Sequence, residues 1–539
     1  MSKDEIVRAV ESAEVVVFPG RNQRDGQRPP VEPPRDGDDL NRRLAAFALT
    51  DLGNAERFEE RFKDHLVHCR SLGWLAWDGR RWSRSRGPDR VAEAERETVR
   101  AIQDEADAIE GTSDDYEMED AKGKKIRRSE ALRKHARASE SRPRVRAISD
   151  LAACRMTAQV SDFDRDPMRF NAQNGTLVFR RSGESGCVVD LLPHNPSDMI
   201  TKLAPVDYDP EARCDVFDGF LEEVQPEEST RRFLAQWCGY SLTGDTSEQK
   251  LCFFYGHGGN GKSVFVDTLS YIAGDYGSSI QIESFLDAGR ARIGGQATPD
   301  LAELPGVRCL TTTEPEKGAK LAEALVKQIT GGDRVKARHL NRDYFSFTPQ
   351  LKLTAMGNYR PEVRGTDEGI WRRIILVPWG ITIPKERRDP GLSEKLHAEA
   401  SGILNRYLAG LTDWIERGLL VPQSALEATA QYREDSDPLG RFLAACTEQA
   451  LGERVVSTEM HRLYCAWAKA NGERVWTPQG FGKAMRERGV MSLKNSVVYW
   501  LDIRLTKNAA DFDNQQTEAA QPIDQDHYGS GYATDYDAD

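Results

Sequence analysis

Short, uninterrupted apolar runs alternate with amphipathic segments through the middle of the 539-residue chain. Three of these runs have the length and composition of buried strands: Leu251–Tyr255, Leu351–Met356 and Ile374–Val377. Two intervening segments carry apolar residues at helical spacing: Val264–Ile272 and Ala319–Ile329. Strands and helices that alternate in this way are typical of a sheet with helices packed on its faces. The pattern predicts an α/β core over residues 251–425.

The pattern differs on the amino-terminal side of this core. Residues 1–44 carry few large apolar side chains, so we expect a disordered leader. Apolar residues at helical spacing then predict a helix from Phe58 to Cys69, and tryptophans surround an Asp78-Gly79 turn. These signals predict a mixed α/β domain over residues 45–215.

A helical segment connects this domain to the core. Apolar residues recur at helical spacing from Phe217 to Thr243, and Gly244 ends the pattern. We therefore expect a helical collar over residues 216–250.

Composition excludes several classes of protein. Hydrophobic residues make up 39% of the chain, and no apolar run approaches the roughly 20 residues that a membrane span needs. The amino terminus lacks the apolar stretch of a secretory signal, so we expect a cytoplasmic protein with no membrane partner, in the host cytoplasm if a phage encodes it. Nine scattered cysteines form no Cys-x-x-Cys pair, which argues against a disulfide framework or a zinc ribbon.

The net charge of −12 is unevenly distributed. Residues 506–539 contain eight acidic residues and one lysine, and we expect a disordered acidic tail there. The rest of the chain is only mildly acidic. This balance excludes a protein that coats DNA by bulk charge, but it permits one whose basic groups line a channel.

Two adjacent charge runs allow two interpretations. Residues 104–120 include nine acidic and no basic residues, whereas residues 122–146 include eleven basic and two acidic ones. Either the runs form a solvated helical pair that neutralises itself, or the basic run presents a face to DNA phosphates.

A glycine-rich loop follows the first apolar strand and precedes a helix. The sequence Gly-His-Gly-Gly-Asn-Gly-Lys-Ser matches the phosphate-binding loop of nucleotide hydrolases. Its backbone N–H groups and lysine would bind the phosphates of ATP, and its serine hydroxyl would bind Mg²⁺. The candidate cofactor-binding residues are Gly256, Gly259, Asn260, Gly261, Lys262 and Ser263.

Hydrolysis also requires a carboxylate to orient the attacking water. Val307–Glu314 reads as a second strand that ends in Glu314. The usual motif has an aspartate before the glutamate, whereas Thr313 stands here. Glu314 is therefore the candidate catalytic and metal-binding carboxylate, and the alternative is a surface glutamate at a strand end.

Three cations alternate with small apolar residues after the Gly331-Gly332 pair. Arg334, Lys336 and Arg338 share one face of a predicted strand, and a turn at Asn341–Asp343 leads to a second strand. Such a hairpin could contact the DNA backbone, although an ordinary solvated strand face has the same pattern.

Two further positions complete the candidate site. Asn358 follows the apolar strand that ends at Met356, where a neutral amide could sense the γ-phosphate. Arg372 and Arg373 precede the next strand and are candidates for an arginine finger that acts on a neighbouring subunit's nucleotide.

These motifs occur in an order that resembles the helicase part of the phage and plasmid primase family. That family is related to the poxvirus primase-helicase and belongs to superfamily 3 helicases. The resemblance extends from about Ala45 to Leu505 and includes these segments: Asn174–Leu177, His194–Asp209, Gly239–Gly244, the glycine loop, Leu301–Gly306, Lys327–Asp333, Ala337-Arg338, Asn358–Pro361 and Trp371–Arg373.

The resemblance implies an AAA+-like P-loop ATPase core that assembles into a ring, usually a hexamer, with nucleotide between subunits. It implies an ATP-dependent helicase of a phage or mobile element that moves on single-stranded and forked DNA, typically 3′ to 5′. It also implies that Arg373 rather than Arg372 is the finger, and that residues 430–505 form a winged-helix domain.

Relatives often carry a primase domain ahead of this region. The leader is too short for one, so we expect unwinding without priming and a separate primase or polymerase as partner. Two alternatives remain: an initiator or loader that uses ATP as a switch without unwinding, and a packaging or transposition ATPase. The second is weakened because no nuclease cluster is recognisable beside the core.

Overall fold

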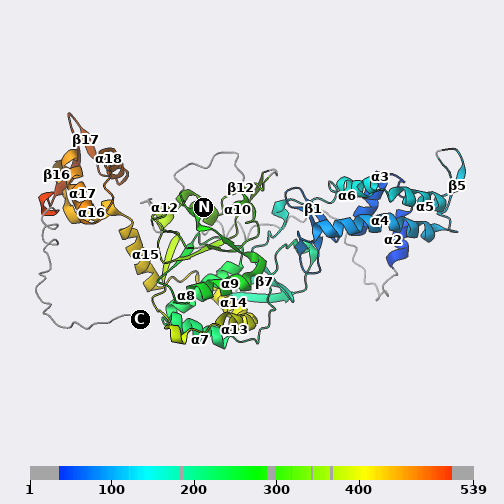
Figure 1. The fold of residues 1–539 in the computed structure, drawn as a ribbon, viewed down its shortest axis with the longest axis horizontal. Coiled ribbons are helices and arrows are strands. Elements are labelled where there is room, and N and C mark those ends of the chain that lie inside the picture. Colours follow the sequence, from blue (N-terminus) through cyan, green and yellow to red (C-terminus); the bar gives the residue numbers. More distant parts are fainter. Residues whose placement is uncertain are drawn as a thin grey trace, which may run out of the picture. The chain divides into compact units, whose positions relative to one another are not determined.

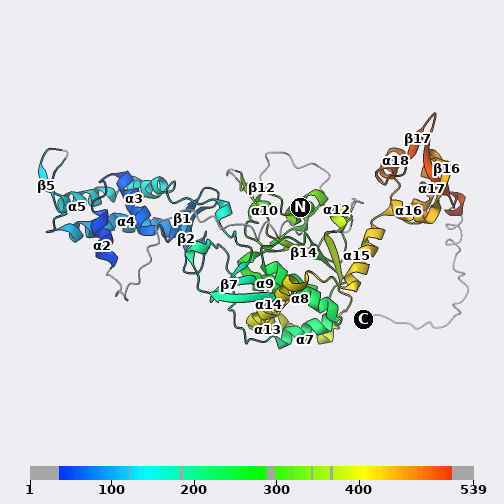
Figure 2. The ribbon, with the colours of Figure 1, turned by 180° about the vertical axis from the view of Figure 1, so that it is seen from behind.

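The computed structural model describes residues 36–120, 122–182, 186–287, 298–312, 314–316, 318–340, 344–363 and 368–512. Figures 1 and 2 show the ribbon from opposite sides. The chain divides into two compact units, one of residues 1–63 and 91–155 and one of residues 64–90 and 156–539. Each unit is described by itself. Among the described residues, no helix is long and apolar enough to cross a bilayer.

The first unit is mainly helical. Its elements are α2 (Asp36–Leu44), α3 (Asp51–Phe62), most of α4 (Gly87–Ile109), β4 (Glu117–Glu119), β5 (Lys125–Arg127), α5 (Arg128–Ser139) and α6 (Arg142–Ala152). At its centre, the buried Arg57 forms an ion pair with the buried Glu105 (2.7 Å) and also donates hydrogen bonds to four backbone carbonyls. Both of these buried charges therefore have a partner, which a buried charge requires.

This unit corrects one sequence prediction and supports part of another. Residues 36–44 of the expected leader form α2, and Leu44 is fully buried, because an amphipathic turn there joins the core of the unit. The acidic and basic runs lie close together: Arg133 pairs with Asp107 and Glu110, both at 2.6 Å. The interpretation as a self-neutralising pair is confirmed for these residues.

The second unit begins with two small antiparallel sheets. The first contains β1 (Leu66–Cys69), β2 (Gly73–Trp77) and β3 (Trp82–Ser83), and the second contains β6 (Arg169–Ala172), β7 (Gly175–Ser182) and β8 (Gly186–Leu192). The predicted helix from Phe58 to Cys69 is wrong beyond Phe62. Residues 66–69 instead form a strand that pairs with β2. The spacing of the apolar residues in so short a segment fits either a helix or a strand, and the pairing with β2 decides between them.

A five-stranded parallel sheet forms the centre of the second unit. Its strands lie in the order β10 (Gly277–Ile280), β11 (Cys309–Thr312), β14 (Lys352–Gly357), β9 (Leu251–Tyr255) and β15 (Ile374–Pro378). All four neighbouring pairs are parallel, so the five carboxyl ends share one edge of the sheet. The predicted α/β class is confirmed.

Helices cover both faces of this sheet. One face packs against α7 (Asp215–Val224), α8 (Glu228–Leu242), α9 (Lys262–Ala273), α13 (Leu392–Ala398) and α14 (Ala400–Arg417), seen together on one side of the sheet in Figures 1 and 2. The other face packs against α10 (Pro299–Ala302), α11 (Glu323–Thr330), α12 (Glu368–Trp371) and the hairpin of β12 (Val335–Ala337) and β13 (Phe345–Phe347). Short 3₁₀ helices span Val160–Asp162, Pro196–Asp198, Gly274–Tyr276, Ile282–Phe285 and Lys385–Arg387.

The predicted collar over residues 216–250 belongs to this layered core. Helix α8 packs directly on α14, where a Cβ added to Gly239 would lie 2.2 Å from the Tyr407 carbonyl oxygen. Glycine at this position therefore allows the two helices to approach closely. Residues of α7 and α8 share one hydrophobic core with β9 and α9.

The carboxyl-terminal part has a core of its own. It contains α16 (Pro438–Cys446), β16 (Thr447–Val456), α17 (Ser457–Ala470), α18 (Pro478–Glu487), β17 (Ser492–Lys494) and β18 (Val498–Leu505), and α15 (Gln423–Asp435) precedes it. The three strands form an antiparallel sheet in the order β16-β18-β17. The fold extends beyond the predicted start of the tail, since Phe512 is buried in this core. Residues 513–539 lie outside the described part.

Candidate functional site

The glycine loop lies at the carboxyl end of β9, where the sequence places it. Gly259 and Gly261 adopt φ angles of 78° and 82°, which favour glycine. A Cβ on Gly256 would lie 2.1 Å from the Trp379 carbonyl oxygen, and one on Gly261 would lie 2.8 Å from the Phe220 ring. Glycine is therefore required both by backbone conformation and by close packing. The loop leads directly into α9, which begins at Lys262.

Two side chains hold the loop in shape. Asn260 is buried and donates a hydrogen bond to the Trp379 carbonyl oxygen (2.8 Å), which ties the loop to the end of β15. The Lys262 ammonium donates to the carbonyl oxygens of Gly256 and His257 and to Asn260 Oδ1. Burial lowers the pKa of Lys262, and the nearby charge of Glu314 opposes that shift. The ammonium thus lies within the loop, where it can bind an anion.

Glu314 and Asn358 lie together at the same edge of the sheet. Because β14 separates β9 from β11, the residues that follow β14 and β11 meet beside the glycine loop. The Asn358 backbone N–H donates to Glu314 Oε1 (2.6 Å), and Asn358 Nδ2 lies 3.4 Å from Glu314 Oε2. The structure therefore brings Lys262, Glu314 and Asn358 together, as the sequence predicts. Thr313 lies outside the described residues.

The donors expected for Mg²⁺ are accessible. Ser263 is exposed at the start of α9, and Glu314 is exposed after β11. Mg²⁺ in nucleotide sites is usually held by one or two protein oxygens together with phosphates and water. A hydroxyl and one carboxylate fit that requirement, so the binding of ATP with Mg²⁺ stays a prediction that these residues support.

Sequence reasoning missed Arg388, which lies against the glycine loop. A Cβ on Gly259 would be 2.1 Å from an Arg388 guanidinium nitrogen. The loop after β15 reaches this position because the Ile383 N–H donates to the Gly259 carbonyl (2.8 Å) and Arg388 Nε donates to the Ile383 carbonyl (3.0 Å). Arg388 is 126 positions from Lys262 in the chain, and no local pattern signals the contact.

Arg372 and Arg373 lie at the opposite edge of the sheet. The Leu251 N–H donates to the Arg373 carbonyl (2.8 Å), so both arginines lie near the amino end of β9, about 15 Å along that strand from the glycine loop. Arg373 is buried and donates to Thr330 Oγ1 (3.2 Å), whereas Arg372 is exposed. Neither can reach its own subunit's loop, and Arg372 is the more accessible of the two.

The predicted hairpin is confirmed. Strand β12 pairs with β13 in antiparallel register, with Val335 and Ala337 buried. Arg334 and Lys336 are exposed on the other face, and the Arg338 guanidinium lies 4.7 Å from the centre of the Tyr344 ring. The predicted turn at residues 341–343 lies outside the described residues.

Taken together, the parallel sheet, the glycine loop and the Glu314–Asn358 pair define an α/β core consistent with a P-loop protein. Comparisons with known proteins point to viral proteins named as helicases or primases. Residues 55–226 match the family described as D5 N terminal like.

The relatives that match include helicase- and primase-named viral proteins. A protein of Acanthamoeba polyphaga mimivirus named as a helicase is 26% identical over 342 residues, which cover 58% of this chain and 35% of that protein. A protein of frog virus 3, also named as a helicase, is 25% identical over 271 residues, which cover 47% of this chain and 28% of that protein. One of African swine fever virus named as a primase is 23% identical over 222 residues, covering 41% and 23%. The matches thus span about a third or less of these relatives' length.

The solved apo structure of the NrS-1 C-terminal region has a TM-score of 0.38 and 13% identity to this chain, covering 56% of it and 78% of that structure. The family match and the viral relatives confirm the predicted resemblance. Residues 55–226 are similar to the D5 N-terminal-like family, and the chain is similar to helicase- and primase-named proteins of large DNA viruses.

Proposed function

We propose that this protein is an ATP-dependent DNA helicase in the replication of a virus or mobile element. The observation that carries the proposal is the meeting of Lys262, Glu314 and Asn358 at the carboxyl edge of the parallel sheet. Ligands of open α/β sheets bind at this edge. The helicase names of the relatives support the choice of DNA as the substrate on which ATP hydrolysis acts.

Each residue has a distinct role in the proposed reaction. Lys262 and the backbone N–H groups of the loop bind the phosphates, and bound Mg²⁺ would neutralise charge that develops on them. Glu314 orients the attacking water and accepts its proton. The Asn358 N–H fixes the position of that carboxylate through its 2.6 Å hydrogen bond.

The position of the arginine pair favours a shared nucleotide site. Arg372 and Arg373 lie at the sheet edge away from their own loop, and the exposed Arg372 is the one placed to contact the nucleotide of a neighbouring subunit. This supports a ring of identical subunits, for which we propose a hexamer. The exposed cations of the β12–β13 hairpin then bind the phosphates of single-stranded DNA.

The test is strand separation on a forked DNA duplex in the presence of ATP and Mg²⁺. We expect the wild-type protein to release the displaced strand and Lys262→Ala to release none, since the loop loses its cation. Lys483→Ala is the matched control, because Lys483 is an exposed lysine of α18. ATP hydrolysis without strand separation would instead support the initiator or loader.

A further inference from the structure

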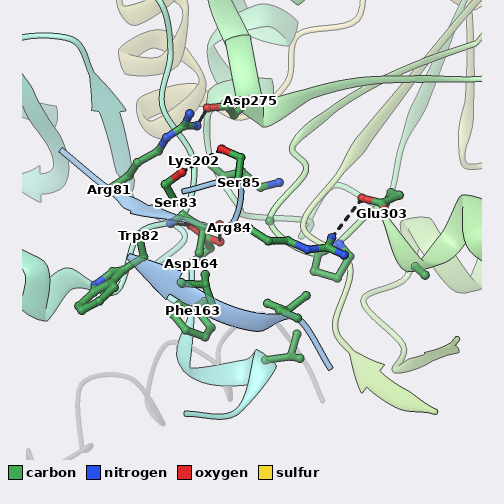
Figure 3. A pocket seen from close by; sticks show the side chains of 17 residues that line it. Arg81, Trp82, Ser83, Arg84, Ser85, Phe163, Asp164, Lys202, Asp275 and Glu303 are labelled. Atoms are coloured by element: carbon green, nitrogen blue, oxygen red, sulfur yellow. Dashed lines mark hydrogen bonds and ion pairs between the residues drawn. The ribbon is translucent and has the colours of Figure 1, made fainter. Parts of the chain in front are cut away.

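A second charged cavity lies in the same unit, at the amino side of the parallel sheet (Figure 3). It has a volume of about 260 Å³ and is bounded by the end of the β1–β3 sheet and by segments that precede β10 and β11. Three basic and three acidic side chains line it: Arg81, Arg84, Lys202, Asp164, Asp275 and Glu303.

The three carboxylates are already engaged. Asp164 accepts hydrogen bonds from the Thr201 N–H (2.8 Å) and hydroxyl (2.5 Å). Asp275 accepts from the Leu203 N–H (3.0 Å) and pairs with Arg81.

Glu303 is engaged less firmly. Its distance to Arg84 is 3.8 Å, and both side chains are largely exposed, so that pair contributes little and can exchange for another anion. Figure 3 shows Arg81 and Arg84 pointing in different directions, Arg81 toward Asp275 and Arg84 toward Glu303.

Lys202 lacks a counter-charge at contact distance. Its ammonium forms no ion pair or hydrogen bond with any residue of the described ranges, although Asp164 and Glu303 lie near enough to favour its charged form. Glycine at position 306 leaves room for the Lys202 side chain, since a Cβ there would lie 2.8 Å from Lys202 Cε. Lys202 is half-buried, and burial lowers its pKa, a shift that the nearby charges of Asp164 and Glu303 oppose. An anion in the cavity would supply that counter-charge.

One wall residue of the cavity contacts the segment that follows β12. Glu303, which faces Arg84, also lies 3.4 Å from His339 Nδ1, two residues beyond the end of β12. The backbones of Thr298 and Arg338 are hydrogen bonded at 3.1 Å. These contacts place the segment after β12 beside Glu303, at the wall of the cavity.

The size of the cavity favours a single phosphate group. Its volume lies below the roughly 300–1,000 Å³ of sites that enclose drug-sized ligands, so a whole nucleoside triphosphate is disfavoured. The hydroxyls of Ser83 and Ser85 are hydrogen bonded to each other at 3.1 Å at the cavity wall, which leaves one O–H of the pair to donate to a phosphate oxygen.

We propose that Lys202, Arg84 and the Ser83–Ser85 pair bind one phosphodiester of the single-stranded DNA that the hairpin holds. This inference rests on the proposed function, because it takes DNA as the polymer.

The experiment measures binding of a fluorescent 30-nucleotide oligo(dT) across a series of NaCl concentrations. The double variant Arg84→Gln with Lys202→Met should weaken binding and reduce the slope of log affinity against log salt by about 0.7, the loss of one phosphate contact. Hydrolysis of ATP without DNA should be unchanged. Arg84→Gln alone, at an exposed residue that can change without loss of fold, should show part of the effect. Arg213→Gln is the control, at an exposed arginine paired with Asp215.

The outcomes separate this inference from the proposed function. If Lys336→Ala with Arg338→Ala reduces the salt slope while the cavity variants leave it unchanged, the cavity inference is wrong and DNA binding stands. If the wild-type protein fails to bind oligo(dT), the proposed function is wrong. A further test adds free dTTP or inorganic phosphate to the Lys262→Ala protein as a competitor of oligo(dT). If the competitor displaces the DNA, and the added change Arg84→Gln abolishes this displacement, the cavity binds a free phosphate ligand. That result would contradict the inference.

Discussion

Replacement of Glu314 by glutamine changes the chemistry of the proposed nucleotide site with little change in its shape. The glutamine carbonyl can still accept the 2.6 Å hydrogen bond from the Asn358 N–H, so the side chain should remain in place. The contact at 3.4 Å with Asn358 Nδ2 becomes donor against donor, which costs about 1 kcal/mol or less. Nucleotide affinity should therefore change less than about fivefold.

Turnover should fall much further. A neutral amide cannot accept the proton of the attacking water, and the loss of a general base costs about 10²–10⁴ in rate, or about 3–5 kcal/mol of barrier. The assays are phosphate release under saturating ATP and binding of a fluorescent ATP analogue. Glu316→Gln is the matched control, because Glu316 is an exposed glutamate two residues further on. A Glu314→Gln protein that retains more than a tenth of wild-type turnover would refute the assignment of the base.

Three other predictions follow from contacts outside this pair. Arg388→Ala should weaken ATP binding about tenfold by removing a cation next to Gly259, measured with the same ATP analogue, and unchanged affinity would contradict this role. If subunits share a nucleotide site as proposed, Arg372→Ala or Arg373→Ala protein mixed with wild-type protein should depress ATP hydrolysis more than dilution explains, whereas a strictly proportional fall would argue against a shared site. Burial lowers the pKa of His135 to about 4, below the value of 6.5 in the unfolded chain. Between pH 4 and 6.5 the unfolded state therefore binds more protons than the folded state, and the free energy of unfolding rises with pH. The free energy of unfolding, measured by denaturant titration at each pH, should drop by about 1–3 kcal/mol from pH 6.5 to pH 4. The His135→Gln variant should show a smaller drop. Equal drops in the two proteins would contradict the role of His135.

The parts of the nucleotide site that sequence reasoning located are those with local signatures. A strand of apolar residues, four glycines and a lysine in fixed order predict the loop at Gly256–Ser263, and the structure places them as expected. Glu314 and Asn358 each follow a strand of the same sheet, so parallel pairing alone brings them to one edge. The alternation at Arg334–Arg338 likewise predicts which side chains face the core.

Contacts that depend on tertiary structure escaped the sequence. The spacing of apolar residues fits a helix through Cys69, but β1 forms because β2 offers a pairing partner. The family resemblance favours Arg373 over Arg372 as the finger, yet Arg373 is buried against Thr330 and Arg372 is the exposed one. The approach of Arg388 to Gly259 depends on the path of the loop after β15, which no residue pattern encodes.

The central claim is that hydrolysis of ATP at Lys262 and Glu314 drives separation of DNA strands. The most direct measurement follows release of a fluorescent strand from a forked duplex with ATP, with a non-hydrolysable ATP analogue, and with the Glu314→Gln protein in ATP. We predict release only by the wild-type protein with ATP. Equal release with the analogue, or release by Glu314→Gln at the wild-type rate, would contradict the account.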